Sequence, residues 1–222
     1  MTNLTVYGSE KASRTWWVVW MCAELGIEYE NVSLEFLGED IGSKDYRTVN
    51  PNALIPSIKD GDFILWESMA INLYLAKKFG GDNYFGSGET EAKAWQWSFW
   101  AVTRVEIPLL TLRIGGSNAD PDSEIGQYYL KHIPLWNDDE LARCRAVLEK
   151  PFLVLNDAVS KQPYLLGEKF SVADLNVACI LSRLQGAQID LSPTPHLNGW
   201  LRRCWSRPGC GRGEQLLAEL TE

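Results

Sequence analysis

The sequence predicts a mixed α/β domain followed by an all-helical domain. Strand and helix patterns alternate over residues 1–80, a glycine-rich break follows at residues 80–88, and helical periodicity dominates from Glu89 onward. We therefore expect domains at residues 1–80 and 90–222, with the glycine-rich segment as the linker between them.

The chain begins with a predicted strand and a predicted helix. Leu4 to Tyr7 reads as a short strand. Ser13 stands at the expected N-cap of the next helix, which continues to Leu25 and ends at Gly26. A helix N-terminus therefore follows the first strand after a short loop.

A second strand is predicted at residues 31–36, where apolar and polar residues alternate. Because a helix connects it to the first strand, the two strands are expected to be parallel. Residues 37–49 are polar and are predicted to form a loop, with Lys44 and Arg47 as its cations.

A hairpin and a helix complete the first domain. Residues 57–59 and 62–66 flank Asp60-Gly61, a strong hairpin signal. Residues 68–79 then carry apolar side chains at the spacing of a helix that lies on a sheet. The predicted order is therefore β-α-β followed by β-β-α.

The second domain is predicted to be all-helical. Its periodicity places helices at residues 90–113, 122–133, 138–160, 172–186 and 195–204. Before the fourth of these, Ser171 precedes Asp174 by three residues, as in a capping box, and Phe170 and Leu175 are spaced as a hydrophobic staple. We expect this cap to support folding and assign it no chemistry.

Composition excludes several classes of function. The formal net charge is −8 and no basic run exceeds two residues, so binding to nucleic acid or to an anionic membrane has little electrostatic support. No apolar stretch has the length of a signal peptide or a membrane span. Five cysteines and two histidines, without metal-ligand spacing, predict reduced thiols in a cytoplasmic protein without a metal site.

Two short motifs predict a corner that binds an amino acid or a peptide. If the bond between Ile55 and Pro56 is cis, the turn exposes the N–H and C=O of Ile55 to an extended peptide; the sequence leaves the isomer open. Glu67-Ser68 opens a helix, with Ser68 as its candidate N-cap. The N-terminus of this helix can hold a carboxylate, while the Glu67 side chain can neutralise an α-ammonium group.

Ser13 lies on the same predicted edge and can donate a hydrogen bond to a thiolate. A free thiol has a pKa near 8.5, so about 3% is ionised at neutral pH. Lowering that pKa by two units takes roughly 2.7 kcal/mol, which a hydroxyl and a helix N-terminus can share. Ser9 and Tyr7 are the rival donors.

The first helix of the second domain carries three side chains that are candidates for the lining of an apolar pocket. Trp97, Trp100 and Arg104 share a helical face by their spacing, although most such aromatic side chains are core residues. If they face the first domain, they border an apolar pocket beside the peptide corner.

With these residues placed, the chain resembles a cytosolic glutathione transferase almost from end to end. The resemblance is carried by segments in a fixed order: Val6-Tyr7-Gly8-Ser9 to Ser13-Arg14, Asn50-Pro51 to Ile55-Pro56, Asp60-Gly61-Asp62, Trp66 to Ile71, and Tyr164-Leu165-Leu166-Gly167 through Asp174. Each segment alone is weak evidence. Their order and separations are specific.

The resemblance implies a thioredoxin-like first domain, a cis Pro56 and a homodimer. It also implies that Ile55 pairs with the cysteinyl part of glutathione, that Glu67 and Ser68 bind the γ-glutamyl group, and that Lys44 or Arg47 holds the glycine carboxylate. Ser13 becomes the thiolate-stabilising hydroxyl of a bacterial, serine-type enzyme; Cys22 lies too deep in the helix to replace it.

The function that this implies is detoxifying conjugation of glutathione, the co-substrate, to a small hydrophobic electrophile. Glutathione-dependent peroxidase or isomerase activity on the same fold is one alternative. A non-catalytic binding or interaction module is another.

Overall fold

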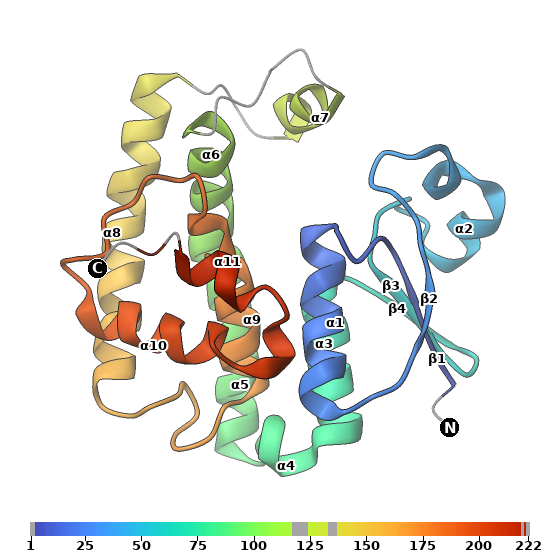
Figure 1. The fold of residues 1–222 in the computed structure, drawn as a ribbon, viewed down its shortest axis with the longest axis horizontal. Helices are drawn as coiled ribbons and strands as arrows, with labels where there is room; N and C mark the ends of the chain where they lie inside the picture. Colours follow the sequence, from blue (N-terminus) through green and yellow to red (C-terminus); the bar gives the residue numbers. More distant parts are fainter. Residues whose placement is uncertain (1–2, 117–123, 133–136, 219, 221–222) are drawn as a thin grey trace. The chain divides into compact units, whose positions relative to one another are not determined.

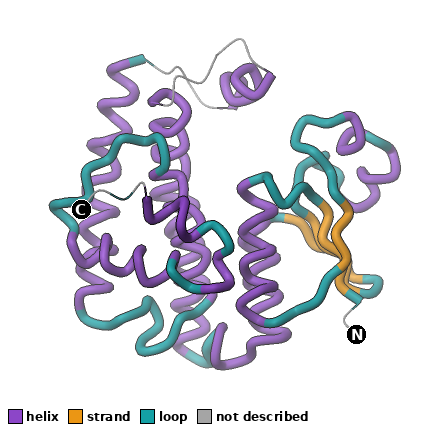
Figure 2. Tube along the Cα trace, in the orientation of Figure 1, coloured by secondary structure: helices purple, strands orange, loops and turns teal. Residues whose placement is uncertain are grey.

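The computed structural model describes residues 3–116, 124–132, 137–218 and 220. Two compact units make up the structure. The first contains the chain up to Glu91 together with Pro208–Gly211, and the second contains Ala92–Arg207 and the chain from Arg212 onward. Among the described residues, strands occur only in the first unit (Figure 2), which confirms the predicted α/β domain followed by a helical one.

The sheet of the first unit has the order β2-β1-β3-β4. Its strands are β1 (Leu4–Tyr7), β2 (Glu30–Val32), β3 (Ser57–Asp60) and β4 (Phe63–Trp66). β1 and β2 are parallel, whereas β3 is antiparallel to both β1 and β4. The predicted parallel pair and hairpin are therefore confirmed.

The second strand is shorter than the prediction of residues 31–36. β2 ends at Val32 because its partner β1 ends at Tyr7. Beyond that point only two backbone bonds link the segments, from Gly8 N to Val32 O (2.9 Å) and from Ser9 N to Leu34 O (2.8 Å).

Helices α1 and α3 lie side by side on one face of the sheet (Figure 1). The α-helices of this unit are α1 (Ser13–Leu25), α2 (Lys44–Val49), α3 (Ser68–Leu75) and α4 (Gly81–Tyr84). A π-helical turn, Ala76–Gly80, extends α3. As predicted, α1 ends at Gly26, whose φ of 63° is left-handed.

The loop prediction for residues 37–49 is wrong in part. This segment contains a 3₁₀ turn, Glu39–Gly42, and helix α2. The side chain of Ser43 caps α2 by accepting a hydrogen bond from Tyr46 N (3.2 Å). Tyr46 packs with Ile41 and Ile55, so tertiary contacts stabilise a helix that is too short to show periodicity.

The glycine-rich segment at residues 80–88 is more structured than a simple linker. It contains α4, and Phe85 directly after that helix is buried. The chain also returns to the first unit near its C-terminus, where a 3₁₀ turn, Pro208–Cys210, packs on α1. There Trp16 Nε1 donates a hydrogen bond to Cys210 O (2.6 Å).

The second unit is helical throughout its described residues. Its helices are α5 (Glu89–Trp100, which begins in the first unit), α6 (Ile107–Gly116), α7 (Glu124–His132), α8 (Asp138–Ser160), α9 (Val172–Leu181), α10 (Pro195–Trp205) and α11 (Gly213–Ala218). A π-helical turn, Ala101–Glu106, joins α5 to α6, and a 3₁₀ turn, Ser182–Leu184, follows α9. The predicted helix 122–133 extends beyond α7 into residues 122–123 and 133, which lie outside the described residues.

Helix α9 is the centre of the second unit, because all ten of its residues are buried. The predicted capping box is confirmed at its N-terminus. The Asp174 carboxylate accepts hydrogen bonds from the Ser171 N–H (3.0 Å) and hydroxyl (2.7 Å). It also accepts from Leu165 N (2.8 Å) and Trp200 Nε1 (2.9 Å), so a single side chain joins α9 to a loop and to α10.

Two buried polar contacts attach α9 and the turn after it to the α5–α6 segment. Asn176 Nδ2 donates to Ser98 Oγ (3.0 Å), and Arg183 pairs with Glu106 (3.0 Å). In the described part of the chain, no helix has the length and apolar composition needed to cross a membrane.

Candidate functional site

Ser13 is the first residue of α1 and does not cap it. The expected N-cap role is wrong: Ala12 is the N-cap, because its carbonyl accepts the first helical bond from Trp16 N (3.0 Å). The Ala12 side chain makes no capping hydrogen bond. Within the described residues the partly buried Ser13 hydroxyl has no hydrogen-bond partner, so it is available to a ligand.

The two rival hydroxyls lie in different surroundings. Ser9 is 3% exposed. Tyr7 lies within β1, with its ring 6.0 Å from that of Tyr46, in the small hydrophobic cluster that α2 shares with the sheet. Ser13 combines partial exposure with a position at an uncapped helix N-terminus, where the helix dipole favours an anion.

The segment before β3 is held by side chains of α2 and its C-cap. Tyr46 Oη donates to Leu54 O (2.6 Å) and lies 3.0 Å from Ser57 Oγ, while Asn50 Nδ2 also donates to Leu54 O (2.7 Å). Burial raises the pKa of Tyr46, so its hydroxyl remains a donor. These contacts fix the backbone on both sides of Ile55 and Pro56.

The Ile55-Pro56 peptide bond is cis in the structure. Ile55 is 7% exposed, yet among the described residues neither its N–H nor its C=O has a hydrogen-bond partner. Buried backbone groups are nearly always paired. Ile55 therefore offers one donor and one acceptor, the arrangement by which an extended peptide adds to a sheet edge.

Glu67 and Ser68 open α3. Glu67 is the N-cap, with φ of 73°, and Ser68 is the first helical residue, not the cap expected from the sequence. The Glu67 side chain is exposed and makes no capping bond. Ser68 is 1% exposed, and its hydroxyl accepts a hydrogen bond from Arg14 Nη1 (3.3 Å), which joins the first turns of α1 and α3.

Lys44 and Arg47 differ in the number of hydrogen bonds that their side chains make within the described part of the chain. Both are exposed on α2. Arg47 donates from Nε to Gly42 O (3.1 Å) and from Nη1 to Pro51 O (3.5 Å). Lys44 has no such contact in the described part of the chain, so its ammonium group is the more available cation.

Trp97, Trp100 and Arg104 belong to the second unit. The rings of Trp97 and Trp100 are partly buried and meet edge to face with centroids 5.1 Å apart. Arg104 is exposed and lies in the π-helical turn after α5, where the spacing of side chains differs from that of an α-helix.

The cysteines are buried, and burial raises the pKa of the Cys22 thiol to about 12.

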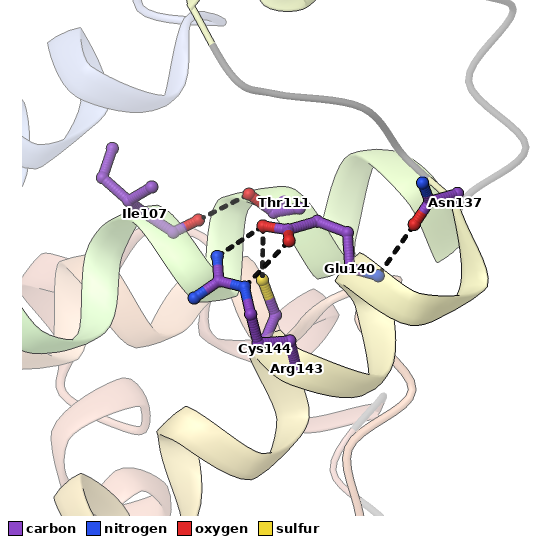
Figure 3. Close-up of polar contacts among 6 residues, drawn as sticks. All are labelled: Ile107, Thr111, Asn137, Glu140, Arg143 and Cys144. Carbon is purple, nitrogen blue, oxygen red and sulfur yellow. Dashed lines mark hydrogen bonds and ion pairs between the residues drawn. The ribbon is translucent and has the colours of Figure 1, made fainter.

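A separate polar cluster lies at the start of α8 (Figure 3), where the Glu140 carboxylate accepts hydrogen bonds from Arg143 and Cys144. Burial and the Glu140 carboxylate raise the pKa of Cys144, so this thiol stays protonated. No group of three metal-ligating side chains occurs among the residues that the structure describes.

Three residues position the candidate site through hydrogen bonds, although the sequence alone predicts no chemical role for them: Arg14, Tyr46 and Asn50. Each acts through a contact with a residue distant in sequence or through a backbone carbonyl. The one hint is position, because Arg14 follows Ser13 and Asn50 precedes a proline.

Comparisons with known proteins match both parts of the chain. Residues 2–77 match the family model "Glutathione S-transferase, N-terminal domain", and residues 124–208 match "Glutathione S-transferase, C-terminal domain". Glutathione S-transferase GstB of Escherichia coli K12 is 26% identical over 211 residues, covering 92% of this chain and 94% of GstB. The disulfide-bond oxidoreductase YfcG of the same organism is 30% identical over 177 residues, covering 76% and 74%.

Solved structures agree on the fold. A glutathione S-transferase from Pseudomonas fluorescens has a TM-score of 0.74 at 26% identity, covering 93% of this chain and 96% of its own. A theta class enzyme from Xanthomonas axonopodis pv. citri, solved with glutathione bound, has a TM-score of 0.79 at 23% identity, covering 96% and 97%. The second likeness is one of fold alone.

Proposed function

The chain belongs to the glutathione S-transferase family, and on that premise we propose that Ser13 ionises the thiol of glutathione for attack on a hydrophobic electrophile. The protein is a glutathione transferase with glutathione as its co-substrate. The serine-type chemistry and the individual site residues are the proposal.

One observation carries the assignment of the site. Among the residues that the structure describes, the first unit contains a Ser13 hydroxyl without a partner at the N-terminus of α1, an Ile55 backbone without partners, and an α3 N-terminus beside Glu67. These features match the thiol, the cysteinyl backbone and the γ-glutamyl group of one tripeptide. The Glu67 carboxylate complements the ammonium, and the α3 N-terminus complements the carboxylate.

The reaction follows from this arrangement. The bound thiol loses its proton to solvent, and the Ser13 hydroxyl donates a hydrogen bond to the resulting thiolate. With an aryl halide, the sulfur forms a bond to the ring carbon and the carbon–halogen bond breaks, releasing halide. The rate gain comes from a larger thiolate population and from proximity, without a covalent enzyme intermediate.

Glutathione binding by the folded protein tests the proposed function. We expect calorimetry to show saturation at millimolar glutathione or below, and an aryl halide assay to show conjugation. Replacing Glu67 with glutamine removes the charge that faces the ammonium, so the Kd of glutathione should rise about tenfold or more. Glu30→Gln removes the same charge from the exposed strand β2 and should leave the Kd unchanged.

Failure of the wild-type protein to bind glutathione would remove the whole proposal. Binding without conjugation of any electrophile would favour the non-catalytic module. Unchanged affinity in Glu67→Gln, with normal wild-type binding, would refute only the role of Glu67.

We propose that Lys44 holds the glycine carboxylate, because Arg47 already donates to two backbone carbonyls. The same titration distinguishes the two residues. Lys44→Gln should weaken glutathione binding more than Arg47→Gln; the opposite order would assign the carboxylate to Arg47.

The electrophile is proposed to contact the aromatic pair Trp97 and Trp100, with Arg104 nearby on the same helical segment. Large aromatic side chains offer apolar surface at low entropic cost. Trp100→Ala should lower kcat/KM for an aryl halide without changing the Kd of glutathione. A change in Kd alone would contradict this role.

A homodimer is supported by exposed apolar side chains in each unit. These are Phe63, Ile64 and Trp66 on β4, Trp95 and Phe99 on α5, and Ile107 on α6. We propose that partner contacts cover these side chains, because large apolar surface left in water is unfavourable. Sedimentation equilibrium of the pure protein decides this, and a monomer at micromolar concentration would contradict it. A cytoplasmic location and a role in detoxification complete the proposal.

Glutathione-dependent reduction of disulfide bonds is a second candidate, favoured by the similarity to YfcG. In that reaction two glutathione molecules are oxidised as one disulfide is reduced to two thiols. A disulfide substrate assayed beside the aryl halide separates the two activities.

A further inference from the structure

A turn near the C-terminus of the chain supports the first turn of α1. The turn Pro208–Cys210 lies in the first unit, although the residues before it and those after Gly211 belong to the second. Trp16 Nε1 donates a hydrogen bond of 2.6 Å to Cys210 O, an acceptor 194 residues away in sequence. Both residues are buried, and a buried indole N–H needs such an acceptor. The predicted domain at residues 1–80 therefore lacks one of the contacts that hold α1.

Trp16 is also the residue that closes the first turn of α1. Its backbone N–H donates to Ala12 O (3.0 Å), which is the first hydrogen bond of the helix. Ala12 N in turn donates to Ser9 O (2.9 Å) in the preceding loop. Ser13 lies between the two residues that the first helical bond joins. The indole bond to Cys210 therefore holds one end of the turn that carries the Ser13 hydroxyl.

The sequence at the start of α1 gives this turn little stability of its own. Ala12 is the N-cap, its side chain makes no capping bond, and the first turn contains no acidic residue. Serine, threonine, asparagine and aspartate are preferred at an N-cap because their side chains accept from the free N–H groups there. Helix ends without such support fray. A long-range bond from Trp16, the fourth residue of the helix, compensates for this weak start.

Trp20 makes a comparable contact farther along the same helix. Its ring stacks on that of Trp16, with centroids 5.6 Å apart and an interplanar angle of 18°. Its Nε1 donates to Glu24 Oε1 (3.0 Å), so this bond joins two residues of α1 beyond the first turn. The two buried indoles thus differ in what they hold. Trp16 holds the start of the helix to the turn Pro208–Cys210, and Trp20 bonds within the helix.

We propose that Trp16 is a positioning residue for the activation of the glutathione thiol and that it acts through Ser13. The Cys210 carbonyl holds the indole, the indole holds the first turn of α1, and that turn places the Ser13 hydroxyl where the thiolate forms. Because Trp16 is buried, it acts on the thiol only through this turn. Its action rests on the proposed function, since it concerns how the hydroxyl of that same site is held.

Trp16→Phe tests this role, because it removes the indole N–H and retains an aromatic ring for the stack with Trp20. The pKa of the bound glutathione thiol should rise by about half a unit or more, while the Kd of glutathione should change by less than about twofold. Titration of thiolate absorbance in the complex measures the pKa, and calorimetry measures the Kd. Benzothienylalanine at position 16, in which sulfur replaces the N–H, should give the same shift and serves as a second variant if Trp16→Phe does not fold.

Trp20→Phe is the matched control. It removes an indole N–H from the neighbouring ring of the same helix, so it should lower the midpoint of thermal unfolding and leave the thiol pKa at its wild-type value. Equal pKa shifts in the two variants would mean that α1 has loosened as a whole and would overturn the proposal. An unchanged thiol pKa in Trp16→Phe, or a rise in Kd without a change in pKa, would overturn it as well.

The double variant Ser13→Ala/Trp16→Phe tests the path through Ser13. If Trp16 acts through that hydroxyl, the thiol pKa of the double variant equals that of Ser13→Ala alone. A further rise as large as the one in Trp16→Phe would refute this path. If Ser13→Ala shifts the pKa and Trp16→Phe does not, only the role of Trp16 is refuted. If the wild-type protein does not bind glutathione, or if Ser13→Ala leaves the thiol pKa unchanged, the proposed function of the site fails first.

Discussion

Replacing Ser13 with alanine should raise the pKa of the bound glutathione thiol by about one unit, because the N-terminus of α1 keeps its share of the stabilisation, and should leave the Kd of glutathione nearly unchanged. The Ser13 hydroxyl has no partner among the described residues and stands at an uncapped helix N-terminus. Its hydrogen bond to the thiolate would exist only in the ionised complex, so its loss affects ionisation and not binding.

The expected loss of turnover follows from the thiolate population. At neutral pH a thiol with a pKa near 6.5 is about three-quarters ionised, and one near 7.5 is about one-quarter ionised, so turnover should fall about threefold. The deficit should shrink as the pH rises through the new pKa. Titration of thiolate absorbance in the binary complex measures the pKa directly.

Ser9→Ala is the informative comparison, and Ser33→Ala, at an exposed position after β2, is the matched control. Both should retain the thiol pKa of the wild-type complex. If Ser13→Ala leaves the titration and turnover unchanged while Ser9→Ala alters them, the thiolate donor is Ser9. If neither variant alters the titration or the turnover, Tyr7 is the thiolate donor that the rival list still contains.

Replacing Asp174 with alanine should lower the free energy of unfolding by about 3 kcal/mol or more. The side chain is fully buried and accepts four hydrogen bonds, two of them from Ser171 and one each from Leu165 and Trp200. Alanine leaves all four donors buried without an acceptor. Burial raises the pKa of Asp174, and these hydrogen bonds oppose that rise.

Denaturant unfolding measures the loss, and calorimetry of the folded variant should give the wild-type Kd for glutathione. Asp190→Ala is the control, because Asp190 also accepts from a following serine but lies at an exposed turn. Asp190→Ala should lower the free energy of unfolding much less than Asp174→Ala does. A fully stable Asp174→Ala protein without activity would refute the structural role and give this residue a part in catalysis.

The fold could be predicted where local chemistry and tertiary structure agree. Asp60-Gly61 predicted the hairpin, Gly26 predicted the end of α1, and the spacing of Ser171 and Asp174 predicted the start of α9. Each signal acts over a few residues, so its physical cause is contained in the sequence that carries it.

Prediction failed where distant contacts decide the local structure. Helix α2 was predicted to be loop because residues 37–49 are mostly polar, and Tyr46 stabilises it by packing against Ile55. The end of β2 depends on where β1 stops. Both Ser13 and Ser68 were expected to be caps, but each lies one residue inside its helix.

From the sequence alone came the residue types of the corner: a hydroxyl at Ser13, the Ile55-Pro56 step and the acidic Glu67. These are properties of single residues and short motifs, so they need no knowledge of the remaining chain. Only the tertiary structure decided that the Ile55 backbone has no partner among the described residues, that Arg14 contacts Ser68, and that the turn Pro208–Cys210 packs on α1. Such facts depend on which distant segments approach each other, and that is determined by packing of the whole unit and not by local pattern.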